Sequence, residues 1–128
     1  VFTRGIDLAE LPVRHGEGKF FAAEETLAEL RKNNQIAIQY ALPDGEPANG
    51  RFPFNPNGSV DDIAGICDAT GRIFGLMPHP EGYNHPTNHP EWTQHKEIDR
   101  RRGTSRQKDL PVGVRILQNG VEYVRSKR

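Results

Sequence analysis

The sequence predicts an α/β fold with a small sheet. Short apolar or alternating stretches are typical of strands, and a stretch with apolar residues at helical spacing is typical of a helix. Glycine, proline and asparagine cluster between these stretches, where turns are expected. The length of 128 residues suits one domain. We therefore expect a single unit, residues 1–128, in which strands and helices share one core.

The first elements come from the N-terminal third. Val1-Phe2 has the character of a strand end, and residues 11–21 predict a second strand. Residues 22–33 predict a helix, because Leu27 and Leu30 recur at helical spacing behind an acidic first turn.

Residues 35–41 alternate apolar and polar side chains and predict a strand. A connector rich in glycine, proline and asparagine follows at 42–59. Residues 63–67 and 72–77 then predict two strands joined in a hairpin. Residues 82–111 carry prolines, histidines and charges with little periodicity, and predict an irregular surface excursion.

The last segment is ambiguous from its pattern alone. Val112, Val114 and Ile116 alternate, and the Asn119-Gly120 pair is a strong hairpin signal. A single helical stripe is equally visible, and Pro111 suits the first position of a helix. The stripe consists of Val114, Leu117, Val121 and Val124.

Composition narrows the functional classes. The chain has 17 basic and 17 acidic residues, so its charge gives no reason to expect nucleic acid or an anionic membrane as partner. One cysteine cannot form an internal disulfide and fits a reducing compartment. We see no apolar stretch long enough for a membrane helix and no signal peptide, and we expect a cytoplasmic protein.

The segment Pro78-His79-Pro80-Glu81 carries the clearest chemistry. It places a histidine and a carboxylate two residues apart directly after an apolar strand. A carboxylate at that spacing can fix the tautomer of the imidazole and stabilise the imidazolium. We predict His79 and Glu81 as catalytic residues, a base and its orienter; the alternative is a structural loop histidine.

This segment resembles the His-Pro-Glu signature of class I (triad) glutamine amidotransferases. Further motifs are similar, in consistent order over residues 1–81 and more loosely beyond, to the glutaminase subunits of phosphoribosylformylglycinamidine synthases. They are Leu11-Pro12-Val13-Arg14-His15-Gly16-Glu17-Gly18-Lys19-Phe20, Asn55-Pro56-Asn57-Gly58-Ser59, Ile63-Ala64-Gly65-Ile66 and Gly75-Leu76-Met77 before the signature.

The resemblance implies a flavodoxin-like three-layer domain of which this chain is the C-terminal half, ending in a helix. In the family a cysteine thiolate attacks glutamine, the residue matching His79 shuttles the proton and the residue matching Glu81 orients it. The ammonia passes to a synthetase subunit that binds ATP and, we expect, Mg²⁺; no cofactor is expected in this chain. The family's nucleophile turn, Gly-x-Cys-x-Gly, lies upstream of the matched motifs and is absent here, so we expect the isolated chain to be inactive.

The sequence around Cys67 resembles that turn, but the elements that should flank a nucleophile turn are not predicted there. A nucleophile turn needs a strand, a strained turn and then a helix. Residues 68–72 form a turn and a second strand follows, so we expect Cys67 to be a buried strand residue and no nucleophile.

Other residues allow weaker hypotheses. By resemblance His15, flanked by glycine, lies near the glutaminase site and helps to bind glutamine or a partner; a strand end that needs glycine is the alternative. Residues 55–59 predict a turn without catalytic role. A metal site is suggested by His79, His85, His89, His95 and Glu91, but Pro86 and Pro90 interrupt the helix it needs, and we expect a surface loop and no metal.

Two functional classes remain. The first is a fragment of a glutaminase subunit with glutamine, a synthetase subunit, and either the absent N-terminal half or a second copy as partners. The second is a non-catalytic binding or interaction protein that keeps the scaffold. Sequence upstream of Val1 would discriminate between them.

Overall fold

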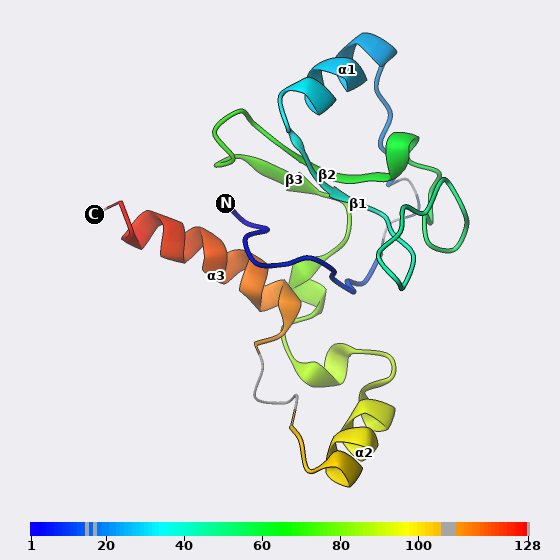
Figure 1. The fold of residues 1–128 in the computed structure, drawn as a ribbon, viewed down its shortest axis with the longest axis vertical. Coiled ribbons are helices and arrows are strands. Elements are labelled where there is room, and N and C mark those ends of the chain that lie inside the picture. The colour runs from blue at the N-terminus through cyan, green and yellow to red at the C-terminus, as the bar shows by residue number, and fades with distance from the viewer. Residues whose placement is uncertain (15, 17, 106–109, 128) are drawn as a thin grey trace.

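The fold is seen in a computed structural model that describes residues 1–14, 16, 18–105 and 110–127 (Figure 1). It mixes helices and strands, so the α/β expectation is confirmed. In chain order the elements are α1 (Glu24–Lys32), β1 (Ile36–Gln39), β2 (Ile63–Cys67), β3 (Phe74–Leu76), α2 (Trp92–Arg102) and α3 (Val112–Arg125). Three short 3₁₀ turns cover Val60–Asp62, Pro80–Gly82 and Pro86–Asn88.

The sheet has the order β1-β2-β3, and both pairs are antiparallel. Gly65 pairs with Leu76 and Cys67 with Phe74, so the predicted hairpin is confirmed in place. Within this three-stranded sheet β2 is central, and no other strand among the described residues pairs with the outer edges of β1 and β3. Figure 1 shows α1 and α3 on opposite sides of the sheet.

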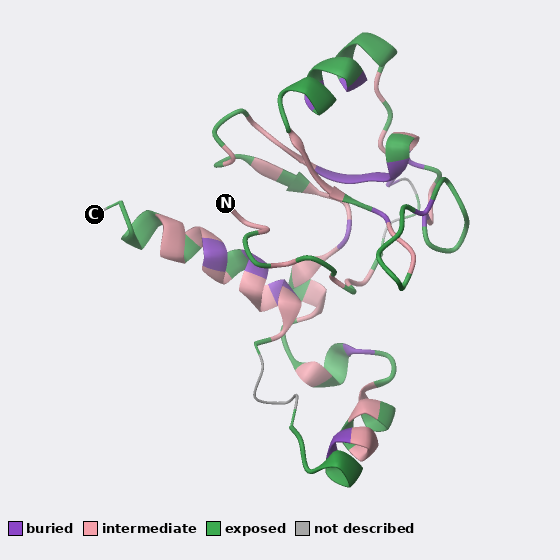
Figure 2. Cartoon of the chain, viewed as in Figure 1, coloured by how far each residue is buried: buried purple, intermediate pink, exposed green. Residues whose placement is uncertain are grey.

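The most deeply buried residues of the sheet lie in β2. Ile63 and Ala64 are fully buried, and Figure 2 shows the start of β2 as the longest buried stretch of the sheet. Leu27 and Leu30 bury the apolar stripe of α1. In α3, by contrast, Ile116 is buried, while Leu117, Val121 and Val124 of the predicted stripe are exposed. The helical spacing in the sequence thus predicted the buried face of α1 correctly.

The ambiguous last segment is the helix α3. Its buried face contacts the N-terminal residues, which the sequence pattern alone could not show. The Asn119 side-chain amide donates to the carbonyls of Phe2 (2.7 Å) and Arg4 (2.9 Å), and Arg4 pairs with Glu122 at 2.8 Å. The Phe2 ring occupies the space that a side chain at Gly120 would need. Residues at the two ends of the sequence are therefore packed together.

Replacing Asn119 by alanine should lower the free energy of unfolding by about 1–3 kcal/mol, because the buried Asn119 amide is the donor to two backbone carbonyls, which lose it. Chemical denaturation measures this change. Gln118→Ala on the same helix is the matched control, since it removes one amide contact, to Glu122 within the same helix, and no contact to the N-terminal residues. Equal losses in the two variants would contradict a special role for Asn119.

Two expectations about the N-terminal third are wrong. Val1-Phe2 leads into a turn, and no strand is present in the described part of residues 11–21. The backbone there bonds to loops and turns: His79 N donates to Pro12 O, and Val60 N donates to Phe20 O. A strand needs a neighbouring strand to pair with, and the described part of this segment pairs with none of the three strands.

The surface excursion 82–111 is more ordered than expected, because it contains the 11-residue helix α2. Pro86 and Pro90 do not prevent this helix, since both precede its first residue, Trp92. Its stop signals were present in the sequence: Arg100, Arg101 and Arg102 lie in the last turn, and Gly103 adopts the left-handed conformation (φ 66°). Among the described residues no helix is long and apolar enough to cross a membrane.

Candidate active site

His79 and Glu81 form a direct contact, with 2.6 Å between His79 Nδ1 and Glu81 Oε1. The spacing of two residues brings them together, as predicted. The chain leaves β3 at Leu76; His79 is still on extended backbone, whereas Glu81 lies in the 3₁₀ segment Pro80–Gly82. His79 N donates to Pro12 O at 2.8 Å, which fixes the start of the turn.

The contact favours one tautomer of His79 and lowers the pKa of Glu81. An ionised carboxylate only accepts hydrogen bonds, so Nδ1 of His79 carries the proton in this contact and the neutral ring keeps its lone pair on Nε2. The hydrogen bond from His79 is the main reason why the pKa of Glu81 is lowered, and the positive charge of Arg14 adds to the effect. This arrangement suits a base held by an orienting carboxylate.

The pKa of Glu81 should rise toward its ordinary value of 4.5 when His79 is replaced by glutamine. Since the folded pKa is lowered, the contact is complete above the ordinary pKa and is lost as the pH falls through the lowered value. A carbon-detected NMR titration of the glutamate side chains measures this.

Glu97 is the internal control for this titration. Arg100 and Arg101 lower its pKa to about 2 from another part of the chain. A Glu81 pKa that does not respond to the loss of His79, while that of Glu97 also stays fixed, would contradict the contact.

A groove of about 430 Å³ lies beside the pair. Its other walls are largely apolar and come from β3, α3 and the N-terminal residues. They include Phe2, Phe74, Leu76, Pro78, Ile116 and Leu117. Gly113 lets α3 approach the turn, because a Cβ there would be 2.0 Å from Pro80 O. The carboxylate–imidazole pair thus lies at the side of an apolar groove.

Cys67 lies at the other end of the hairpin. It is the last residue of β2 and pairs with Phe74, from which β3 runs on toward His79. We expected Cys67 to be buried, but it is partly exposed. The reason is that it adjoins the turn whose backbone the Asp68 carboxylate holds by hydrogen bonds. This position agrees with a strand residue that takes no part in the His79 contact.

His15 lies outside the described residues, so its predicted role stays a prediction. The turn expected at residues 55–59 is present, but it belongs to a buried polar network that we did not predict. Asn55, Ser59 and Asp62 are its members. The type of residue alone gave no signal, because asparagine, serine and aspartate are common in exposed turns.

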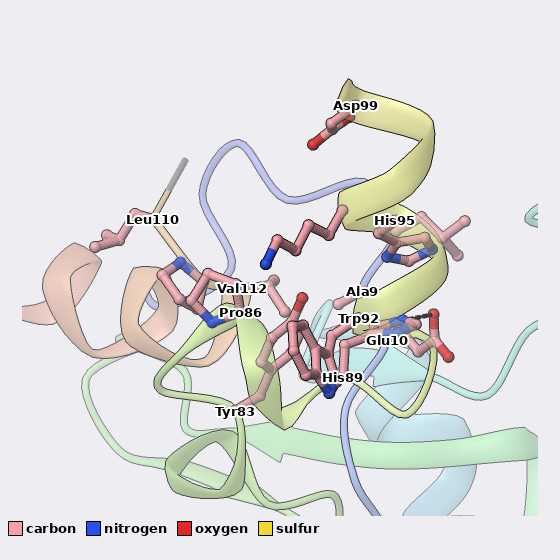
Figure 3. A pocket seen from close by; sticks show the side chains of 13 residues that line it. Ala9, Glu10, Tyr83, Pro86, His89, Trp92, His95, Asp99, Leu110 and Val112 are labelled. Carbon is pink, nitrogen blue, oxygen red and sulfur yellow. Dashed lines mark hydrogen bonds and ion pairs between the residues drawn. The ribbon is translucent and has the colours of Figure 1, made fainter. Parts of the chain in front are cut away.

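The expectation of a surface loop is wrong for His89, which is only 7% exposed. Its Nε2 contacts Glu10 Oε2 at 2.8 Å, and its Nδ1 accepts from Glu91 N at 3.0 Å. Figure 3 shows it beside Tyr83 and Trp92 at a cavity of about 300 Å³. Hydrogen bonds occupy both ring nitrogens, and no group of three or more metal-binding side chains occurs in the described part of the chain.

Comparison with known proteins gives one consistent result. Residues 1–124 match the family described as the CobB/CobQ-like glutamine amidotransferase domain. The chain is also similar to proteins named phosphoribosylformylglycinamidine synthase subunit PurQ. That of Methanococcus maripaludis strain S2 is 49% identical over 123 residues, which are 96% of this chain and 45% of the relative.

A more distant relative of the same name supports this result. The protein from Dehalococcoides mccartyi is 40% identical over 125 residues, which are 98% of this chain and 43% of the relative. The chain therefore spans somewhat less than half the length of these relatives. Because the match to the family covers residues 1–124 of this chain, the chain belongs to the CobB/CobQ-like glutamine amidotransferase domain family.

Proposed function

We propose that this chain provides the proton-transfer part of a glutaminase centre, with His79 as base and Glu81 as its orienting carboxylate. The observation that carries the proposal is the 2.6 Å contact between His79 Nδ1 and the Glu81 carboxylate. With the proton on Nδ1, Nε2 is the nitrogen that can accept a proton. A thiol that gives its proton to Nε2 becomes the thiolate that attacks the side-chain amide of glutamine. The protonated His79 then donates to the departing ammonia, and a γ-glutamyl thioester remains for hydrolysis.

The nucleophile of this reaction must come from outside the described residues. The sole cysteine of the chain lies at the far end of the hairpin. The groove at His79 is bordered by the free edge of β3, and α3 exposes an apolar stripe formed by Leu117, Val121 and Val124. An unpaired edge and an exposed apolar stripe both favour association. We propose that a nucleophile-bearing segment docks here and completes a flavodoxin-like three-layer domain.

The names of the relatives support our proposal for the partners. Their name describes a subunit of phosphoribosylformylglycinamidine synthase. In our proposal the ammonia passes to a cytoplasmic synthetase subunit, which amidates formylglycinamide ribonucleotide with ATP and Mg²⁺. The chain itself needs no cofactor, because thiolate attack and proton transfer use only side chains.

The isolated chain should show no glutaminase activity above background, because His79 has no thiol to activate. Adding a separately expressed nucleophile-bearing half and the synthetase subunit should produce ammonia release from glutamine. Sedimentation should show that the lone chain associates, with itself or with that half.

Three results would oppose this proposal. A complemented mixture that binds but never hydrolyses glutamine would favour a non-catalytic interaction protein. Glutamine hydrolysis by the lone chain that is lost on Cys67→Ser would make Cys67 the nucleophile. A lone chain that stays a monodisperse monomer over a wide concentration range would oppose the docking surface.

A further inference from the structure

The cavity of about 300 Å³ at His89 lies where three separated parts of the chain meet. Its lining comes from residues 8–10, from residues between Tyr83 and Asp99, and from residues 110–112 at the start of α3. It shares no lining residue with the groove beside the proposed catalytic pair: Glu81 borders the groove, and Tyr83 borders the cavity. The cavity is therefore a separate place on the molecule, and what it binds does not depend on the glutaminase chemistry.

One wall of this cavity is aromatic, and it is formed by the rings of Tyr83, His89, Trp92 and His95. The ring centres of His89 and His95 are 4.4 Å apart, and those of Tyr83 and His89 are 6.0 Å apart. Figure 3 shows Tyr83, His89 and Trp92 close together at the cavity. Aromatic side chains pack well against other rings in offset or tilted arrangements. The wall therefore suits a flat ring.

His89 contributes only its ring face to this wall. The side chain is 7% exposed, and its Nδ1 accepts from Glu91 N at 3.0 Å. Nε2 then carries the proton and donates it to Glu10 Oε2 at 2.8 Å. Because both nitrogens are engaged, the ring has no hydrogen bond and no lone pair left for a ligand. Polar recognition at this cavity must come from another side chain.

Lys96 supplies that polar group. Its Nζ lies 5.8 Å from the centre of the Trp92 ring, and it forms no ion pair with any carboxylate of the described residues. The two carboxylates that line the cavity, those of Glu10 and Asp99, accept hydrogen bonds from other side chains. A cation without a carboxylate partner beside an apolar cavity favours an anionic ligand.

The rest of the lining is largely apolar and leaves room for a single ring. It includes Leu8, Ala9, Leu110, Pro111 and Val112. An apolar cavity of about 150 Å³ is enough to hold benzene, and small-molecule sites begin at about 300 Å³. The cavity therefore has room for one ring with a small substituent.

We propose that this cavity binds a planar aromatic or heteroaromatic molecule that carries a carboxylate or phosphate group. The ring packs between the aromatic wall and the apolar residues opposite, and the anionic group lies at the ammonium of Lys96. Aromatic packing and one charge-assisted contact together select the ligand, and neither His79 nor Glu81 takes part.

Trp92 is the only tryptophan of the chain, so its indole N–H signal in NMR reports on this cavity directly. Benzoate and phenyl phosphate should shift the signal saturably, and the tighter of the two identifies the anionic group. Both should bind at least about fivefold more tightly than benzylamine, because an attraction at Lys96 is replaced by a repulsion. Acetate and inorganic phosphate should leave the signal in place, since they have no ring.

Lys96→Met should weaken the binding of benzoate about two- to fivefold, which is the range of an exposed ion pair, and leave that of uncharged benzyl alcohol unchanged. Lys127→Met is the matched control, because its ammonium lies 5.6 Å from the Tyr123 ring, outside the cavity lining. Val112→Phe should abolish the binding of all ring compounds by filling the cavity.

The site would be overturned if neither benzoate nor phenyl phosphate shifted the indole signal saturably, or if acetate shifted it as much as benzoate does. Benzylamine that binds as tightly as benzoate would overturn the anionic class of ligand. Equal losses of benzoate affinity in Lys96→Met and Lys127→Met would overturn the role of Lys96. Unchanged binding in a folded Val112→Phe variant would place the ligand outside this cavity.

Discussion

His79→Ala should reduce kcat of the complemented glutaminase roughly 10³-fold or more, because members of a catalytic triad act as a unit. Without the imidazole no group is placed to take the thiol proton or to protonate the departing ammonia. Glu81→Gln should cost less, since it removes the orienting charge 2.6 Å from Nδ1 but leaves the base in place. Ammonia release under saturating glutamine measures both changes.

His85→Ala is the control for His79→Ala. His85 is exposed, and its Nδ1 bonds to Thr87 in a separate 3₁₀ turn, so this variant should keep its activity. Cys67→Ser should also remain active in the complemented enzyme. A complex that is indifferent to His79→Ala would reduce the Pro78-His79-Pro80-Glu81 segment to a scaffold element.

Gly113→Ala should have the largest effect on stability among single-methyl additions. A Cβ at this position would be 2.0 Å from Pro80 O and 2.5 Å from Tyr83 O, which are backbone atoms on both sides of Glu81. Relieving such an overlap costs typically about 1–3 kcal/mol. Alanine is also about 1 kcal/mol better than glycine inside a helix, so a net loss would come from the overlap alone.

Thermal unfolding and the NMR signals of Glu81 are the measurements for Gly113→Ala. The variant should unfold at lower temperature and shift the Glu81 signals, because α3 must move away from the turn. Gly75→Ala in β3 is the control, since its Cβ would meet only Ile66 O at 4.0 Å. Equal effects of the two substitutions would contradict a close approach of α3.

The parts of the fold that local patterns determine were predictable from the sequence. The spacing of Leu27 and Leu30 predicted α1, and the hairpin 63–77 was visible because its strands and turn are contiguous. The strand expected at 11–21 is wrong, because its backbone partners are Ser59, Val60 and His79, distant positions that periodicity cannot reveal.

The candidate site shows the same division. His79 and Glu81 are two residues apart, so the sequence could predict their contact. The network around Asp62 was not predictable, because it needs two consecutive left-handed aspartates and backbone donors 12 and 13 residues away. His89 was misjudged for a similar reason, since its partner Glu10 is 79 residues away.

The hydrogen bonds of Asn119 to Phe2 and Arg4 close loops of 117 and 115 residues, and this has a consequence for folding kinetics. Closing so long a loop costs much chain entropy before any contact offsets it, whereas the β2–β3 hairpin closes locally. We expect the hairpin to be formed in the transition state and the docking of α3 on the N-terminal residues to follow. Changes at Asn119 should then accelerate unfolding and leave the folding rate nearly unchanged, while changes in the hairpin should slow folding.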